Sequence, residues 1–159
     1  MKKIALTFLA CLSTFAFADK TPTAQTEKTA RPENMLYLSV YQKTPQNDLS
    51  KDLQKQKISR KAKNEQICWV ATGKFGPKVK TVELFKSPAP TSFSSPDAIT
   101  KASQDKRHHT IERIISSFQK GELVVNCWTF NQQDPVGQYT LQVNIDDVYF
   151  PAVTFEVTK

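Results

Sequence analysis

Strict alternation of apolar and polar residues near the C-terminus constrains this chain more than any other feature of its sequence. Every second residue is apolar in YTLQVNI (139–145) and again in VTFEV (153–157). Successive side chains of a strand point to opposite faces of a sheet, so a period of two indicates strands with one buried face. Asp146 and Asp147, between the runs, are typical of a turn. The sequence therefore predicts an antiparallel hairpin. Its inward residues are Tyr139, Leu141, Val143, Ile145, Val153, Phe155 and Val157.

Other runs alternate in the same way or are rich in β-branched and aromatic residues, which favours further strands. They are MLYLSVYQ (35–42), QICWVATG (66–73), KVKTVELF (78–85), HTIERIISSF (109–118) and GELVVNCWTF (121–130). Glycine and proline in GKFGPK (73–78) suit a hairpin or a tight corner, and DPVG (134–137) is a turn sequence.

Two segments are less clear. The polar, basic run LSKDLQKQKISRKAKNEQ (49–66) fits either a weak helix or an excursion between strands. Ser95 followed by Pro96 is typical of a helix start, so PDAITKASQ (96–104) is expected to form two helical turns. The predicted fold class is mainly β. We expect a single antiparallel β-sandwich over residues 35–159, with one disulfide and at most one or two short helices.

The N-terminus has the pattern of a cleaved signal peptide over residues 1–18. Two lysines precede an apolar stretch that is too short to span a bilayer, and AFA (16–18) supplies small residues for cleavage. The rival interpretation is a lipoprotein cleaved before Cys11. Residues 19–34 hold no large apolar side chain and are expected to form a disordered tether. We therefore expect a periplasmic protein with no transmembrane span in its mature chain.

Removal of the leader leaves two cysteines, Cys68 and Cys127. An even pair in an oxidising compartment predicts one structural disulfide. A redox-active pair is the alternative, but the C-x-x-C spacing typical of that chemistry is missing.

Each of these cysteines is followed directly by one of the two tryptophans, Trp69 and Trp128. Neighbours on a strand face opposite sides, so cysteine and tryptophan cannot share a core layer. Either the disulfide lies between two sheets with the tryptophans outside, or the tryptophans fill the core and the bridge lies on an outer face. The neighbouring residues leave both alternatives open. Because exposed tryptophan is enriched at interface hot spots, Trp69 and Trp128 are also candidate partner-binding residues.

The run DPVGQYTLQVNIDDVYFPAVTFEV (134–157) resembles the closing hairpin of bacterial extracytoplasmic immunoglobulin-like domains, which often carry a D-P-x-G-x-Y turn. The resemblance implies a β-sandwich that is immunoglobulin-like in the loose sense. The cysteine separation is similar to that of the inter-sheet bridge of immunoglobulin domains. Val125 stands where antibody-type domains have a tyrosine, which favours a looser sandwich.

The layout of signal peptide, polar tether and disulfide-bearing domain also resembles, more weakly, the TfpC family of periplasmic type IV pilus biogenesis proteins. That resemblance implies a role in stabilising type IV pili from the periplasm.

The sequence has no recognisable catalytic motif. It lacks G-x-S-x-G, H-E-x-x-H and a phosphate-binding glycine loop. His108 and His109 are adjacent and lie near Asp105 and Glu112, but a solvated loop is favoured over a metal site because no further ligand set is convincing. We predict no cofactor and no metal.

Positive charge is concentrated in residues 51–63, KDLQKQKISRKAK. The segment is either a solvated loop or a docking patch for an acidic surface. Nucleic acid is an unfavoured partner because the patch contains no aromatic residue for base stacking. The candidate partner-binding residues are Lys51, Lys55, Lys57, Arg60, Lys61 and Lys63.

These observations predict a non-catalytic, exported protein-interaction or assembly module, with support of type IV pili as the specific hypothesis. The expected partner is an envelope or pilus-related protein with an acidic surface. The rival hypothesis is a small secreted enzyme or enzyme inhibitor whose site is not visible in the sequence.

Overall fold

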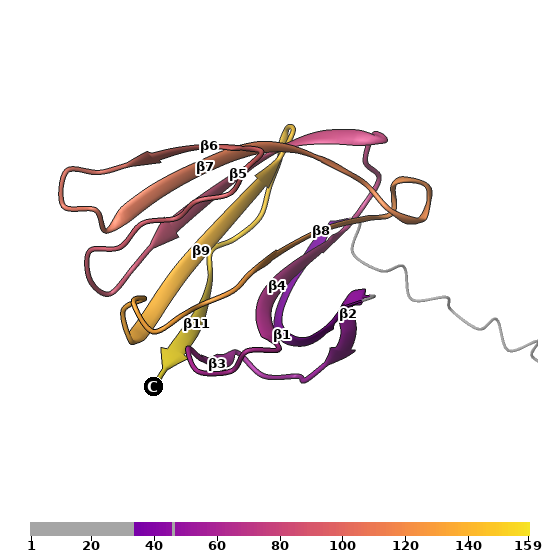
Figure 1. Ribbon diagram of the computed structural model, residues 1–159. Helices are drawn as coiled ribbons and strands as arrows, with labels where there is room; N and C mark the ends of the chain where they lie inside the picture. The colour runs from indigo at the N-terminus through magenta and orange to yellow at the C-terminus, as the bar shows by residue number, and fades with distance from the viewer. Residues whose placement is uncertain (1–33, 46) are drawn as a thin grey trace, which may run out of the picture.

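A computed structural model describes residues 34–45 and 47–159, without the side chains of residues 47–50. Over these residues the chain forms two β-sheets that pack into a sandwich (Figure 1). The predicted signal peptide and all but the last residue of the predicted tether lie outside this range. Within the described part, no helix is long and apolar enough to cross a membrane.

The smaller sheet has the strand order β2-β1-β4-β8, and its strands pair antiparallel. These strands are β1 (Met35–Thr44), β2 (Asn47–Asp52), β4 (Glu65–Thr72) and β8 (Leu123–Trp128).

The larger sheet has the order β3-β11-β9-β5-β7-β6, with β10 also pairing with β9. Only the short β3 runs parallel to its neighbour, β11. These strands are β3 (Lys57–Ser59), β5 (Lys78–Lys86), β6 (Ala98–Ala102), β7 (His108–Ser116), β9 (Gly137–Ile145), β10 (Val148–Tyr149) and β11 (Val153–Thr158). A single 3-10 turn, η1 (Gln119–Gly121), precedes β8.

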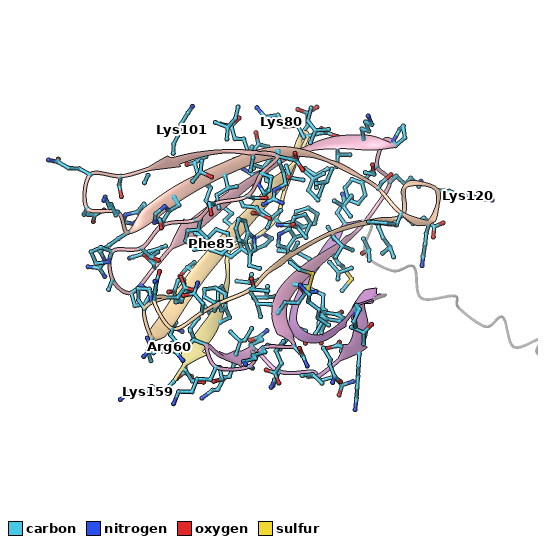
Figure 2. The ribbon with its side chains drawn as sticks, in the orientation of Figure 1. Arg60, Lys80, Phe85, Lys101, Lys120 and Lys159 are labelled. Carbon is cyan, nitrogen blue, oxygen red and sulfur yellow. A yellow bond between two sulfur atoms is a disulfide. The ribbon has the colours of Figure 1, made fainter. Side chains whose placement is uncertain are left out.

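The predicted C-terminal hairpin is confirmed. β9 and β11 pair antiparallel, with Tyr139 opposite Phe155 and Leu141 opposite Val153. Of the seven residues expected to point inward, all are buried except Val153, which is half-buried. Phe85, labelled in Figure 2, lies among these side chains between the sheets.

Tyr139 stabilises the turn that precedes β9. Its hydroxyl donates a 2.8 Å hydrogen bond to the carbonyl of Pro135, four residues upstream. The tyrosine corners of immunoglobulin-like sandwiches make the same kind of bond. Burial raises the pKa of the Tyr139 hydroxyl, and the negative charge of Asp134 raises it further. The group therefore remains a neutral donor.

The disulfide between Cys68 and Cys127 is present, but it joins neighbouring strands of one sheet. The two cysteines are directly opposed across β4 and β8, with their Cα atoms 4.1 Å apart. The likeness to an inter-sheet immunoglobulin bridge is therefore wrong. The spacing along the sequence did not reveal that β4 and β8 are adjacent in space.

The expected helix at 96–104 is also wrong, because this segment contains β6. Ala98 to Ala102 pair antiparallel with β7, and this ladder outweighs a local helix signal of only two turns. The basic segment is an excursion and not a helix: β2 extends the smaller sheet and β3 extends the larger one.

GKFGPK (73–78) forms a corner, because it carries the chain from β4 in the smaller sheet to β5 in the larger. Gly121 packs against this corner with a positive φ of 91°. A Cβ atom at Gly121 would lie 2.3 Å from the carbonyl oxygen of Phe75, so only glycine fits there.

We expect Val143→Asp to unfold the domain or to lower its free energy of unfolding by about 4 kcal/mol or more, because it places an unpaired charge in the core. Val143 has no exposed surface. Gln142→Asp on the outer face of the same strand is the control and should change stability little. Chemical denaturation followed by circular dichroism measures both, and equal stabilities would contradict the face assignment.

Candidate functional site

The two tryptophans converge on one buried carboxylate, Glu83 of β5. Trp69 of β4 donates its indole Nε1–H to Glu83 Oε1 at 2.5 Å. Trp128 of β8 donates its own Nε1–H to Glu83 Oε2 at 3.0 Å. Asn126 Nδ2 adds a third donor at 2.6 Å from Oε1. We call these four residues, together with Arg113, the Glu83 cluster.

The repeated Cys-Trp pair follows from this arrangement. Cys68 and Cys127 are opposed on the outer face of the smaller sheet, so the residues that follow them point inward. The inward neighbours are Trp69 opposite Asn126, and Ile67 opposite Trp128. The disulfide thus fixes the register that brings both indole N–H groups to one carboxylate of the facing sheet.

The expectation that a tryptophan is exposed at the surface is therefore wrong. Trp69 has no exposed surface and Trp128 is 8% exposed. Their polar atoms are used inside the sandwich, as the N–H of a buried tryptophan usually is.

The charge of Glu83 is balanced only indirectly. Burial raises the pKa of Glu83, whereas the hydrogen bonds from Trp69, Asn126 and Trp128 and the positive charge of Arg113 lower it; burial dominates. Arg113 Nη1 donates to Asn126 Oδ1 at 3.1 Å, and the guanidinium carbon lies 5.1 Å from the centre of the Trp128 ring. Asn126 therefore connects the cation to the anion without direct contact between them.

The sequence held a signal for Glu83. In KVKTVELF the inward positions are Val79, Thr81, Glu83 and Phe85, so an acidic residue occurs where the alternation predicts a core side chain. A buried carboxylate needs donors, and tryptophan is the donor that a core can most readily supply.

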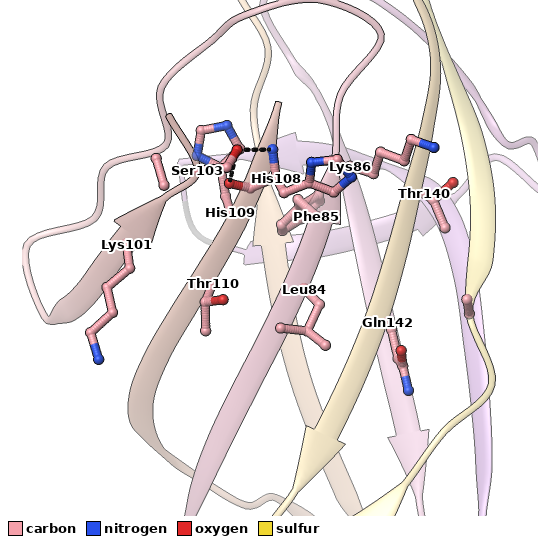
Figure 3. A pocket seen from close by; sticks show the side chains of 12 residues that line it. Leu84, Phe85, Lys86, Lys101, Ser103, His108, His109, Thr110, Thr140 and Gln142 are labelled. Atoms are coloured by element: carbon pink, nitrogen blue, oxygen red, sulfur yellow. Dashed lines mark hydrogen bonds between the residues drawn. The ribbon is translucent and has the colours of Figure 1, made fainter. Parts of the chain in front are cut away.

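The outer face of the larger sheet carries a shallow hollow of about 480 Å³. A row of side chains crosses it from four neighbouring strands: Lys101 of β6, Thr110 of β7, Leu84 of β5 and Gln142 of β9 (Figure 3). Outward-facing residues therefore form the floor of the hollow. It lies at the end of the sheet that is next to the β6–β7 turn.

The two adjacent histidines lie beside this hollow. Because they are neighbours on β7, their side chains point to opposite faces of the sheet. His109 is 3% exposed, and its Nε2 lies 3.0 Å from the carbonyl oxygen of Lys106. His108 is exposed, with Nδ1 4.0 Å from Asp105 Oδ1. Among the described residues, no group of three or more His, Cys, Asp or Glu side chains is placed to hold a metal ion.

Ser103, Asp105 and His108 occur together but lack the geometry of a nucleophilic triad. Ser103 Oγ donates to Asp105 Oδ1 at 2.5 Å. It also accepts the backbone N–H of His108 at 3.0 Å (Figure 3). A triad requires the serine proton to point at an imidazole nitrogen. Here the same atoms close the turn between β6 and β7.

Three cations of the basic segment contact other parts of the chain. Lys55 pairs with Glu65 at 2.9 Å, and Lys57 pairs with Glu156 of β11 at 2.8 Å. Arg60 donates from Nη1 to the carbonyl of Asp134 at 3.0 Å. Lys51, Lys61 and Lys63 are exposed. The structure places Lys51 on β2 of the smaller sheet and Lys57 on β3 of the larger sheet, and partner binding by the six residues stays a prediction.

We expect Glu83→Gln to change how stability depends on pH. The pKa of Glu83 is raised, so the folded state holds the carboxyl proton more tightly than the unfolded chain does. In the unfolded chain the pKa of a glutamate is about 4.3. This contribution to the free energy of unfolding is fully present below that pH and is lost as pH rises through the raised pKa.

Over that interval the wild type should therefore lose stability relative to Glu83→Gln, as measured by urea unfolding at a series of pH values. Glu122→Gln at an exposed position controls for the loss of a carboxylate. Parallel pH profiles of the wild type and Glu83→Gln would contradict the expectation.

Comparison with known proteins places this sandwich in a family. A family model described as the PM0630 beta sandwich domain matches residues 36–158. A relative from Pasteurella multocida (strain Pm70), with the printed name uncharacterized protein PM0630, is 31% identical over 108 residues. The alignment spans 65% of this chain and 65% of the length of that relative. The chain therefore belongs to the PM0630 beta sandwich domain family.

Proposed function

We propose that this chain is a non-catalytic binding module of the bacterial cell envelope that docks a partner protein on the outer face of its larger sheet. The observation that carries the proposal is the pair Ile99 and Ile114, which are 66% and 68% exposed. They project outward from the adjacent strands β6 and β7 and line a hollow of about 510 Å³. Large aliphatic side chains that are exposed side by side mark interaction sites.

The charge around this pair favours an acidic partner surface. Lys80, Lys86 and Lys101 lie on the same face of β5 and β6. Glu112 is the one carboxylate at the outward positions of β5, β6 and β7, and it pairs with Lys80 at 3.0 Å. Asp97, just before β6, is a second carboxylate in the lining of the hollow, so the three lysines outnumber the carboxylates by one. An apolar centre within a polar rim is the usual anatomy of a protein-binding patch.

An exported location is part of the proposal. The signal-peptide pattern of residues 1–18 supports it, as does the disulfide, because disulfides persist in oxidising compartments. Within the envelope, the weak resemblance to TfpC proteins makes type IV pilus biogenesis our specific hypothesis for the assembly that this module serves.

Photo-crosslinking in the native envelope tests the binding face. A photoreactive residue at Ile99 or Ile114 should capture the same partner protein from both positions. The control position is Tyr37 of β1, which is 46% exposed and belongs to the smaller sheet. Capture of that partner equally well from Tyr37, or from neither isoleucine, would contradict the proposal.

The double variant Ile99→Glu with Ile114→Glu should lose this partner and keep the fold, because it places negative charge against an acidic surface. Both side chains are exposed, so the free energy of unfolding should change by less than about 0.5 kcal/mol. A strain that lacks the chain should have fewer surface pili, restored by the wild type but not by the double variant. Normal piliation would exclude the pilus hypothesis and would leave the binding face to be judged by the crosslinks.

A further inference from the structure

We infer that the free edge of β8 is a second binding site, which takes an extended, acidic segment of a partner protein as an added strand. This site belongs to the smaller sheet and stands independently of the face proposed above.

The backbone of β8 is open on one side. Among the described residues, β8 ends the strand order of the smaller sheet, and its ladder runs to β4 alone. Its first residue, Leu123, also forms an isolated bridge with Phe118. An edge strand presents unpaired N–H and C=O groups, which are a ready template for another strand.

A groove of about 740 Å³ runs along this edge. Five consecutive residues, from Val125 to Thr129, line it. Side chains of a strand alternate between faces, so a hollow lined by consecutive residues includes the strand edge. Gln66 of β4 and Lys43 of β1 also line it, so the groove extends from the edge onto the outer face of the smaller sheet. Ser94, Ser95 and Pro96 of the β5–β6 loop belong to the lining as well.

Trp128, one of the residues that line the groove, is held in place by aromatic packing. Phe93, from the β5–β6 loop, stacks on Phe85 with ring centres 4.5 Å apart and meets the Trp128 ring edge-on at 5.4 Å. These aromatic contacts close the interior of the sandwich behind the groove. A partner strand therefore meets a preformed surface, which lowers the entropic cost of binding.

The electrostatics of the groove select an acidic occupant. Its lining includes two cationic side chains, Lys43 and Arg113, and no carboxylate. Arg113 is held against Trp128 and by Asn126, and its buried Nε–H has no hydrogen-bond partner. A guanidinium has five donors and pairs most strongly with carboxylates, so an oriented arginine with unused donors suits an acidic side chain.

The same charges argue against the other candidate occupants. A second copy of this chain would bring Lys43 and Arg113 against their own counterparts. Residues 19–33 hold three acidic and three basic side chains and so offer no net attraction. The formal charge of the whole chain is +7, which steers acidic partners toward it.

Two blocked octapeptides test the inference: one alternates valine with glutamate, and the other alternates valine with lysine. We expect the glutamate peptide, at millimolar concentration, to shift the amide resonances of β8 and the indole resonance of Trp128. It should also slow hydrogen exchange of alternate β8 amides. The lysine peptide should do neither.

Ser94→Glu places a carboxylate on the groove wall, so it should weaken binding of the glutamate peptide by about tenfold, the effect of losing one favourable charge contact. The matched control Ser92→Glu, exposed in the same loop but outside the lining, should leave binding unchanged. The inference is overturned if neither peptide shifts β8, if both do so equally, or if β8 is occupied by a second copy in a concentration-dependent dimer. Shifts confined to β6 and β7 would also overturn it, while supporting the face that carries Ile99 and Ile114.

Discussion

A single buried carboxylate determines how the two sheets of this domain meet. Glu83 has no exposed surface, and it accepts three hydrogen bonds from two strands of the opposite sheet. An unpaired buried charge costs several kcal/mol, so the sandwich is stable only where those donors are in place. The indoles of Trp69 and Trp128 can reach the same carboxylate only in one register of β4 and β8. The disulfide between Cys68 and Cys127 stabilises that register from the outer face.

The Glu83 cluster makes the packing of the two sheets specific, which apolar contacts alone would not do. Replacing aliphatic core residues by others of similar volume usually costs little, because dispersion contacts are not directional. Removing the Trp128 indole, by contrast, would leave Oε2 of Glu83 without its donor, at a cost of about 1–3 kcal/mol. Arg113 extends the same network to the surface, since it stacks on Trp128, bonds Asn126 and also lines the groove beside β8. A change in that groove is therefore linked to the centre of the core through two contacts.

The fold could be predicted from the sequence where local pattern and tertiary environment agree. Alternation alone identified β9 and β11 and nearly all of their buried residues, because one-sided burial imposes a period of two. Prediction failed where long-range pairing decides the outcome. Residues 98–102 are a strand because β7 lies beside them, and the disulfide lies within one sheet because β4 and β8 are neighbours. Sequence and structure point to different candidate sites. Charge predicted a docking patch at residues 51–63, whereas the exposed pair Ile99 and Ile114 resembled ordinary strand residues in the sequence.

The distribution of polar groups indicates where binding is to be sought. The core carboxylate accepts hydrogen bonds from the two indoles, and the serine and aspartate of the β6–β7 turn bond each other. These groups therefore have few donors or acceptors left for a ligand. Surface that is open to a partner remains at two sheet edges. Exposed aliphatic residues lie at β6, the last strand of the larger sheet, and an oriented arginine lines the groove at β8. Natural sheets usually protect their edges, because an open edge invites pairing with any extended chain. The cations around both edges narrow that choice, since they repel other copies of this basic chain and attract acidic segments. An open edge that would otherwise promote self-association thus becomes selective through charge.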